Sequence, residues 1–145
     1  MRLPYRQEPV AVSPAHPERD STLRPRIRIR LKHGNQSVDL FALIDSGADD
    51  CLFPVGLAKL LGLKLRPQNV GRYVGIGPGE IVAIFHTITL EVGDWSLPIY
   101  AGFLDTPTAP ALLGQNGFFS QFEVKFNLRR ETIELKPLHT SLSRS

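Results

Sequence analysis

The residues best suited to chemistry lie together at positions 42–50, which read Ala-Leu-Ile-Asp-Ser-Gly-Ala-Asp-Asp. Asp45 leaves an apolar run and enters a Ser-Gly turn. We therefore expect its carboxyl group at the end of a strand, on the floor of whatever cleft that strand end faces. Gly47 would let the backbone come close to a substrate or to a second carboxylate. Because Asp-Ser-Gly is also a common β-turn, the chemistry depends on what surrounds it.

A second segment, residues 74–79, reads Val-Gly-Ile-Gly-Pro-Gly between two extended arms. Its glycines relax the backbone, which would let a hairpin tip lift and close, and apolar Ile76 would help to exclude water from a reaction below it. Pro78 would stiffen the tip and remove one amide donor. The alternative is a rigid glycine-rich turn.

A third motif, residues 111–114, reads Ala-Leu-Leu-Gly and is followed by Gln-Asn. In this order, the three segments resemble the motifs of the retropepsin family, the retroviral-type aspartic proteases. Residues 42–50 resemble the active-site turn of that family and residues 74–79 its flap tip. Residues 111–114 resemble its hydrophobic-hydrophobic-Gly motif, whose strand passes beneath the turn. The similarity extends over about residues 24–136.

The resemblance implies a fold as well as motifs. That fold is all-β: a single-domain, closed retropepsin-like structure with a flap hairpin and one short helix after the Leu-Leu-Gly motif, functional as a homodimer. The composition agrees, because 12 glycines and 12 prolines in 145 residues suit short strands joined by tight turns.

The resemblance also implies an activity, the hydrolysis of peptide bonds by an aspartic endopeptidase. That chemistry needs two carboxylates that share one proton, one acting as base toward water and the other as acid toward the scissile carbonyl. The chain has one such turn and is too short for a second lobe, so a second copy must supply the other aspartate. The implied catalytic residues are Asp45, Ser46 and Gly47. In the family arrangement the serine braces the two turns across the twofold axis, and the glycine leaves room for the peptide substrate.

The family pattern further implies substrate-binding residues in the turn and the flap, namely Ala48, Asp49, Asp50, Gly75, Ile76 and Gly77. The two acids either line substrate subsites or brace the dimer by pairing with arginine. Members of the family commonly carry an arginine after Leu-Gly, where this chain has Gln115. The partner of Asp49 is then missing or is supplied elsewhere, by Arg24 or Arg26.

Apolar periodicity predicts the elements that would position these motifs. Residues 26–32 alternate cations with aliphatics, which predicts a strand with one buried face and one solvated cationic face. Residues 55–61 can form a short helix that Gly62 ends. The other expected elements are strands at 37–44, 81–90, 95–103, 122–127 and 132–135, a hairpin over 71–91, and a short helix at 116–121.

The N-terminal segment has a different character. Residues 1–22 carry four prolines among polar residues and show no apolar periodicity, so we expect a flexible arm there. The protease-like domain would span residues 23–137, followed by a tail at 138–145. With an arm of this length before the first strand, the dimer interface could be built from the C-terminal strands alone.

The remaining features argue against several other classes of protein. Cys51 cannot form an internal disulfide and is expected to be a small buried side chain. No stretch approaches the roughly 20 apolar residues of a membrane span, and no signal-peptide apolar region opens the chain. We therefore expect a cytoplasmic protein with no membrane partner. No His/Cys cluster and no phosphate-binding loop occurs, so no metal and no cofactor are expected. The cationic strand lacks interleaved aromatics, which disfavours nucleic acid as a partner.

The alternatives to a protease are a serine hydrolase and a catalytically weak module. Ser46 does not lie in a Gly-x-Ser-x-Gly elbow, which argues against a serine hydrolase. The rival that stays open is a catalytically weak retropepsin-like module that dimerises or binds peptides, because Gln115 and Pro78 depart from the family pattern. A peptide-cleavage assay with Asp45→Asn as control distinguishes this module from an enzyme.

Overall fold

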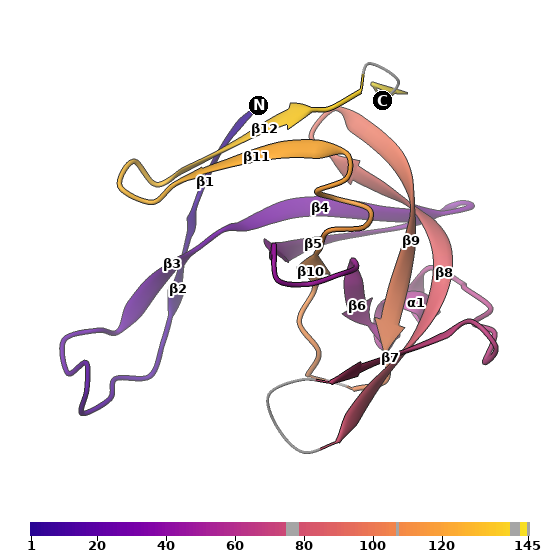
Figure 1. Cartoon of the computed structure of the whole chain (residues 1–145), viewed down its shortest axis with the longest axis horizontal. Coiled ribbons are helices and arrows are strands. Elements are labelled where there is room, and N and C mark those ends of the chain that lie inside the picture. The colour runs from indigo at the N-terminus through magenta and orange to yellow at the C-terminus, as the bar shows by residue number, and fades with distance from the viewer. Residues whose placement is uncertain (75–78, 107, 140–142, 145) are drawn as a thin grey trace.

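Strands form most of this chain. The structure is a computed structural model, and it describes residues 1–74, 79–106, 108–139 and 143–144. Figure 1 shows the arrangement of the elements. In chain order they are β1 (Arg2–Pro4), β2 (Arg6–Pro9), β3 (Ser21–Arg24), β4 (Arg26–His33), β5 (Gln36–Ile44), β6 (Leu52–Pro54), α1 (Val55–Leu60), β7 (Val70–Val74), β8 (Glu80–Val92), β9 (Trp95–Leu104), β10 (Leu112–Leu113), β11 (Phe122–Asn127), β12 (Thr132–Pro137) and β13 (Ser143–Arg144).

The main sheet closes on itself. Its strand order is β13-β9-β6-β10-β5-β4-β8-β7, and β8 pairs additionally with β9. This extra pairing joins the two sides of the sheet, so that β9, β6, β10, β5, β4 and β8 form a ring with no free edge among them. Two pairs of neighbouring strands in the ring are parallel, β10 with β5 and β6 with β9. The expected all-β fold is confirmed.

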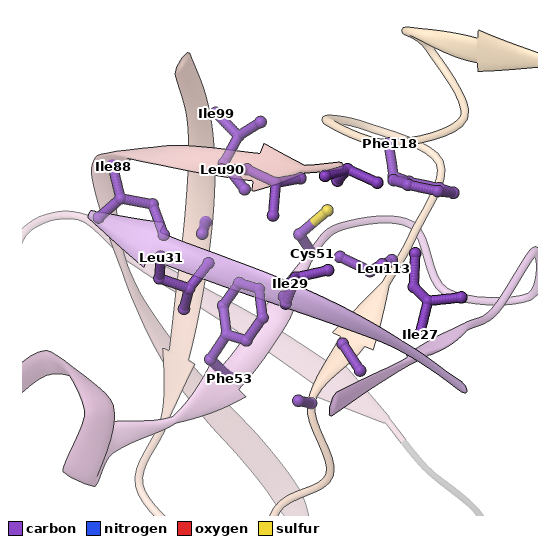
Figure 2. Packing of buried hydrophobic residues seen from close by; sticks show 14 of the residues in the cluster. Ile27, Ile29, Leu31, Cys51, Phe53, Ile88, Leu90, Ile99, Leu113 and Phe118 are labelled. Atoms are coloured by element: carbon purple, nitrogen blue, oxygen red, sulfur yellow. The ribbon is translucent and has the colours of Figure 1, made fainter. Parts of the chain in front are cut away.

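The interior of the ring is filled by aliphatic and aromatic side chains. Along β4, Ile27, Ile29 and Leu31 are buried, while the cations between them lie on the opposite face, as their alternation predicts. They belong to one core cluster with Phe53 of β6 and Leu90 of β8 (Figure 2). Burying one such side chain stabilises the fold by about 1.5–3 kcal/mol. This cluster therefore supports the ends of the strands from which the functional residues extend.

Most of the expected elements are present with small shifts of their ends. The strands expected at 37–44, 81–90, 95–103, 122–127 and 132–135 are β5, β8, β9, β11 and β12. The short helix expected before Gly62 is α1. The hairpin expected over residues 71–91 is formed by β7 and β8, which pair antiparallel from Val70↔Ile84 to Val74↔Glu80.

The expected helix at residues 116–121 is wrong. This segment is a series of turns, with hydrogen bonds from the Ser120 amide to the Gln115 carbonyl at 2.9 Å and from the Gln121 amide to the Phe118 carbonyl at 2.9 Å. Gly117 has a φ of 106°, a conformation that glycine adopts easily and that a right-handed helix does not contain. The only α-helix in the described residues is α1, so the short helix precedes the Leu-Leu-Gly motif instead of following it.

The N-terminal segment also differs from the expected flexible arm, because it contains strands. β1 pairs antiparallel with β12, from Arg2↔Glu134 to Pro4↔Thr132, and the Met1 amino group donates to the Leu135 carbonyl at 2.9 Å. β2 pairs with β3 in a separate hairpin. The pattern of residues 1–22 could not reveal the first pairing, because the partner strand lies at the other end of the chain. Prolines are compatible with such short edge strands.

Candidate active site

The end of β5 delivers Asp45 to a point where three strands meet. The Ile44 amide donates to the Pro25 carbonyl, just before β4, at 2.9 Å. The Asp45 amide donates to the Leu113 carbonyl of β10 at 3.0 Å. The backbone on both sides of the Ile44–Asp45 peptide is therefore fixed by neighbouring strands, and the position of the carboxyl group follows from the barrel.

The Asp45 side chain closes the turn that follows it. The Gly47 amide donates to Asp45 Oδ1 at 2.9 Å, and the Ala48 amide donates to the Asp45 carbonyl at 3.2 Å. Asp45 is partly exposed, and Ser46 and Gly47 are exposed. The turn thus presents an anchored carboxylate and a stretch of open backbone at the surface of this single chain.

Gly114 explains why the Leu-Leu motif must end in glycine. A Cβ atom at this position would lie 2.3 Å from the Asp50 carbonyl oxygen and 2.6 Å from the Ala48 carbonyl oxygen. Both contacts are with backbone, which cannot move aside without distorting the turn. The chain directly after β10 therefore passes against the turn, at a distance that only a residue without a side chain allows.

Gln115 continues this support, in the position where the family commonly has arginine. Its amide donates to the Ala48 carbonyl at 2.8 Å, and its side-chain Nε2 donates to the Ser46 carbonyl at 2.7 Å. The next residue adds a third bond, from the Asn116 amide to the Asp49 carbonyl at 2.8 Å. The backbone carbonyls of the turn are thus held by neutral amide donors, and the turn does not depend on an arginine.

Asp50 is held from two sides by neutral donors. The Tyr73 hydroxyl donates to Asp50 Oδ2 at 2.6 Å, and Asn116 Nδ2 donates to Asp50 Oδ1 at 3.3 Å. Burial, followed by the hydrogen bond to Asp50 and the charges of Asp50 and Asp49, raises the pKa of Tyr73 above its ordinary value. The phenol therefore stays protonated and remains a donor. This contact ties β7, the first arm of the hairpin, to the loop that carries Asp45.

Asp49 is exposed, and the arginines expected to pair with it are engaged elsewhere. Arg26 Nε lies 2.8 Å from one carboxylate oxygen of Glu8, and Arg24 Nε lies 3.4 Å from the other. The expectation that Arg24 or Arg26 is the partner of Asp49 is therefore wrong. The reason is that β2 pairs with β3, which brings Glu8 to the side of both cations.

The β7–β8 hairpin packs on its own small apolar cluster next to the turn. Leu52, Ala83, Phe85 and Leu104 are buried there, with Tyr73 packed against them. The Tyr73 and Phe85 rings have centroids 6.5 Å apart. The base of the hairpin is thus anchored, whereas the expected substrate-binding residues at its tip, Gly75, Ile76 and Gly77, lie outside the described residues.

Three further expectations concern Cys51, a metal site and a membrane span. Cys51 is fully buried, and burial raises the pKa of its thiol to about 11, so it is the small, inert core side chain that was expected. Within the described residues no group of three His, Cys, Asp or Glu side chains is arranged to hold a metal ion. No helix in that part of the chain is long and apolar enough to cross a membrane.

Sequence reasoning missed two contributors to this region, Tyr73 and Asn116. Tyr73 directly precedes the glycine-rich segment but is not part of its motif, and only the pairing of β7 with β8 brings it to Asp50. Asn116 belongs to the Gln-Asn pair that follows Leu-Leu-Gly. Its role depends on an isolated parallel bridge between Asp50 and Asn116, which local patterns do not reveal.

Comparisons with known proteins agree with this architecture. No protein-family model matches the chain, and no curated protein matches it in sequence. Among solved structures, it is similar to a retropepsin-like aspartic protease from Rickettsia conorii, with a TM-score of 0.55 and 18% sequence identity. The match covers 88% of this chain and 96% of that one. At this identity the likeness shows the fold alone, which is retropepsin-like.

Proposed function

We propose that this chain is an aspartic endopeptidase whose active site forms when two copies bring their Asp45 side chains together. The observation that carries the proposal is the anchored Asp45 turn. Its amide is bonded to Leu113, its carboxylate accepts from Gly47, and Gly114 passes directly against the turn. The similarity of the fold to a retropepsin-like aspartic protease supports the same conclusion.

The chemistry needs a pair of carboxylates that hold one proton between them. The ionised member removes a proton from a water molecule, which attacks the scissile carbonyl carbon, and the protonated member donates to the carbonyl oxygen. The proton taken from water then passes to the leaving nitrogen as the carbon–nitrogen bond breaks, and one hydroxyl of the tetrahedral intermediate returns a proton to the other carboxylate, which restores the singly protonated pair. A single copy supplies one such carboxylate, so the second comes from a twofold-related copy. Ser46 would brace the two turns across the axis, and Gly47 would leave room for the substrate.

The substrate would be an extended peptide held between the turn and the β7–β8 hairpin. Ala48, Asp49 and Asp50 border the turn, and residues 75–77 at the hairpin tip would cover the peptide. Because Asp50 already accepts from Tyr73 and Asn116, its part is to position the hairpin arm, and Asp49 is the acid free to face the substrate. We propose residues 23–137 as the catalytic domain, with residues 1–22 as an added segment and 138–145 as a tail.

Cleavage of a peptide library between about pH 3 and pH 9 tests the proposal, with Asp45→Asn as the inactive variant. Because one shared proton is required, activity should pass through a maximum in the acid range, at about pH 4 to 6. Asp45→Asn keeps the side-chain shape but removes the base, so cleavage should be lost. Glu123→Gln is the matched control, because it converts an exposed carboxylate of β11 to an amide. It should leave cleavage unchanged.

Two outcomes would contradict the proposal. Wild-type cleavage by Asp45→Asn would show that this residue is not part of the reacting pair. Absence of cleavage by the wild-type chain, with specific binding of peptides by both proteins, would favour the peptide-binding module.

A further inference from the structure

The hairpin formed by β2 and β3 is ordered by its own contacts. Glu8 pairs with Thr22 and Pro9 with Ser21 across the two strands. The Val10 amide extends the ladder by donating to the Asp20 carbonyl at 2.9 Å. Gln7 Nε2 adds a side-chain bond to Ser21 Oγ at 2.9 Å. The segment is therefore a defined projection, and its tip comprises residues 10–20.

The tip is apolar, uncharged over much of its length and uncovered. Residues 9–17 read Pro-Val-Ala-Val-Ser-Pro-Ala-His-Pro, without a Lys, Arg, Asp or Glu. Val12 is 57% exposed, and the residues around it are nearly all exposed. Of the described residues 6–24, none belongs to either buried cluster or packs against one. A two-stranded hairpin is marginally stable alone, and an exposed apolar surface of this kind is typical of an interaction site.

The hairpin is rooted next to Asp45. Between β3 and β4 lies Pro25, whose carbonyl accepts from the Ile44 amide, one residue before Asp45. β4 and β5 are antiparallel, with Arg26 opposite Leu43, so the start of β4 lies beside the end of β5. The ion pair of Glu8 with Arg26, at the start of β4, helps to fix the direction in which the hairpin leaves. It therefore continues past the end of β5, beyond Asp45. In Figure 1 it leaves the start of β4 and extends away from the barrel.

The position of the β2–β3 hairpin beside Asp45 indicates what could cover its tip. Two Asp45 carboxylates that share a proton must lie within hydrogen-bonding distance of each other, so the twofold axis passes close to both turns. A hairpin rooted beside the turn and directed away from its own barrel is then placed to extend over the other copy. Resting on the proposed function, we propose that the β2–β3 hairpin of each copy clasps the second copy of this chain, with the uncharged residues 10–17 of its tip packed on the partner.

The clasp is reciprocal, because a twofold axis applies the same contact to both copies. It makes the N-terminal segment a dimerisation element, whereas the sequence left the C-terminal strands as the expected interface. β1 is held by β12 of its own chain, so the copies need not exchange this strand. The base of the hairpin contacts its own barrel, with Arg6 over the Phe41 ring, but among the described residues its tip belongs to neither buried cluster and packs against neither.

Two hairpin variants test the clasp by sedimentation equilibrium over a range of protein concentrations. Val12→Asp places a charge at the exposed tip, where it cannot disturb the core. A second variant replaces residues 11–19 by Asn-Gly, a two-residue turn that suits the hydrogen-bonded pair of Val10 and Asp20. Each should raise the dimer dissociation constant by about tenfold or more, as loss of a central interface contact does. Leu60→Asp is the control, an equally exposed leucine on α1, and it should leave the constant unchanged.

A direct probe is possible because the one cysteine of the chain, Cys51, is buried and does not react. In Val12→Cys, position 12 carries the only accessible thiol, so a photoreactive maleimide attached there should form covalent dimers on irradiation.

The outcomes separate the two proposals. If the folded variants dimerise with the wild-type constant and no covalent dimer forms, the clasp is wrong while the Asp45 pair stands. If the wild-type chain is monomeric at every concentration and still cleaves peptides, the Asp45 pair and the clasp both fail.

Discussion

The Asp45 turn and the β2–β3 hairpin lie side by side in this chain and are built in opposite ways. The turn is held within one copy. Leu113, Gln115 and Asn116 hydrogen-bond its backbone groups, and Gly114 lies directly against it. The hairpin satisfies its own backbone but leaves its apolar tip uncovered. The difference indicates which contacts belong to folding of the single chain and which to assembly. Substitutions in the turn should act on stability and catalysis, whereas those in the hairpin should act on dimerisation.

The largest expected effect within the turn is that of Gly114→Ala. The added Cβ would lie within 2.6 Å of two backbone carbonyl oxygens, so the turn must move or the strand must separate from it. We expect the free energy of unfolding to fall by about 3 kcal/mol or more, as measured by urea denaturation. Gly56→Ala is the matched control. Its Cβ meets nothing within 4 Å, and alanine in helix α1 should stabilise the protein by about 0.5–1 kcal/mol. Equal stability of Gly114→Ala and the wild type would mean that the turn is not closely packed.

A smaller effect is expected where the Asp45 turn meets β7, the first arm of the β7–β8 hairpin. Tyr73→Phe removes the hydroxyl that donates to Asp50, so β7 loses its bond to the Asp45 loop while its ring still packs near Phe85. We expect a loss of about 1 kcal/mol in stability and a several-fold fall in kcat/KM, because the arm that positions the substrate is released.

Tyr100→Phe is the control for this change. Tyr100 also contacts the Phe85 ring, but it is 53% exposed and its hydroxyl has no hydrogen bond within the described part of the chain. Equal kcat/KM values for the two variants would show that the hydrogen bond from Tyr73 to Asp50 does not position the β7–β8 hairpin.

The smallest effect is expected on the outer face of the strands that lead into the turn. Arg30 and Arg28, which hydrogen-bond Asp39 across β4 and β5, lower the pKa of that carboxyl group to about 2. A carboxylate with a lowered pKa in the folded state stabilises the protein above its unfolded pKa of about 3.9, and this stabilisation is lost as the pH falls through about 2.

Thermal unfolding of Asp39→Asn measures this contribution. At pH 6 its melting temperature should lie slightly below that of the wild type, because exposed ion pairs contribute little. The difference should disappear near pH 2. A difference that persists unchanged at that pH would mean that ionisation of Asp39 is not its source.

The comparison also explains which parts of the molecule could be predicted. The strands with strict alternation, such as β4, were predicted correctly because burial of Ile27, Ile29 and Leu31 follows from a period of two. The Asp45 turn, the β7–β8 hairpin and the Leu-Leu-Gly motif were predicted from their resemblance to one family. In each case the information lies within a few consecutive residues.

The errors arose where distant residues decide the structure. The pairing of β1 with β12 joins the two ends of the chain, so nothing within residues 1–22 indicates it. The expected helix at 116–121 fails because Gly117 takes a positive φ and the segment instead bonds to the turn. The contact of Tyr73 with Asp50 likewise depends on how β7 lies in the sheet.

The central claim, that one Asp45 from each of two copies forms the reacting pair, is tested most directly by mixing chains. Wild-type chain at fixed concentration is mixed with increasing Asp45→Asn chain, under conditions that allow the copies to exchange, and peptide cleavage is measured. If the pair must contain two aspartates, mixed dimers are inactive, and activity per wild-type chain should fall to about half in an equal mixture and to about a quarter at a threefold excess of the variant. Adding Glu123→Gln chain instead should cause no loss per active chain. Activity that stays constant as Asp45→Asn is added, with mixed dimers shown to form, would contradict the account.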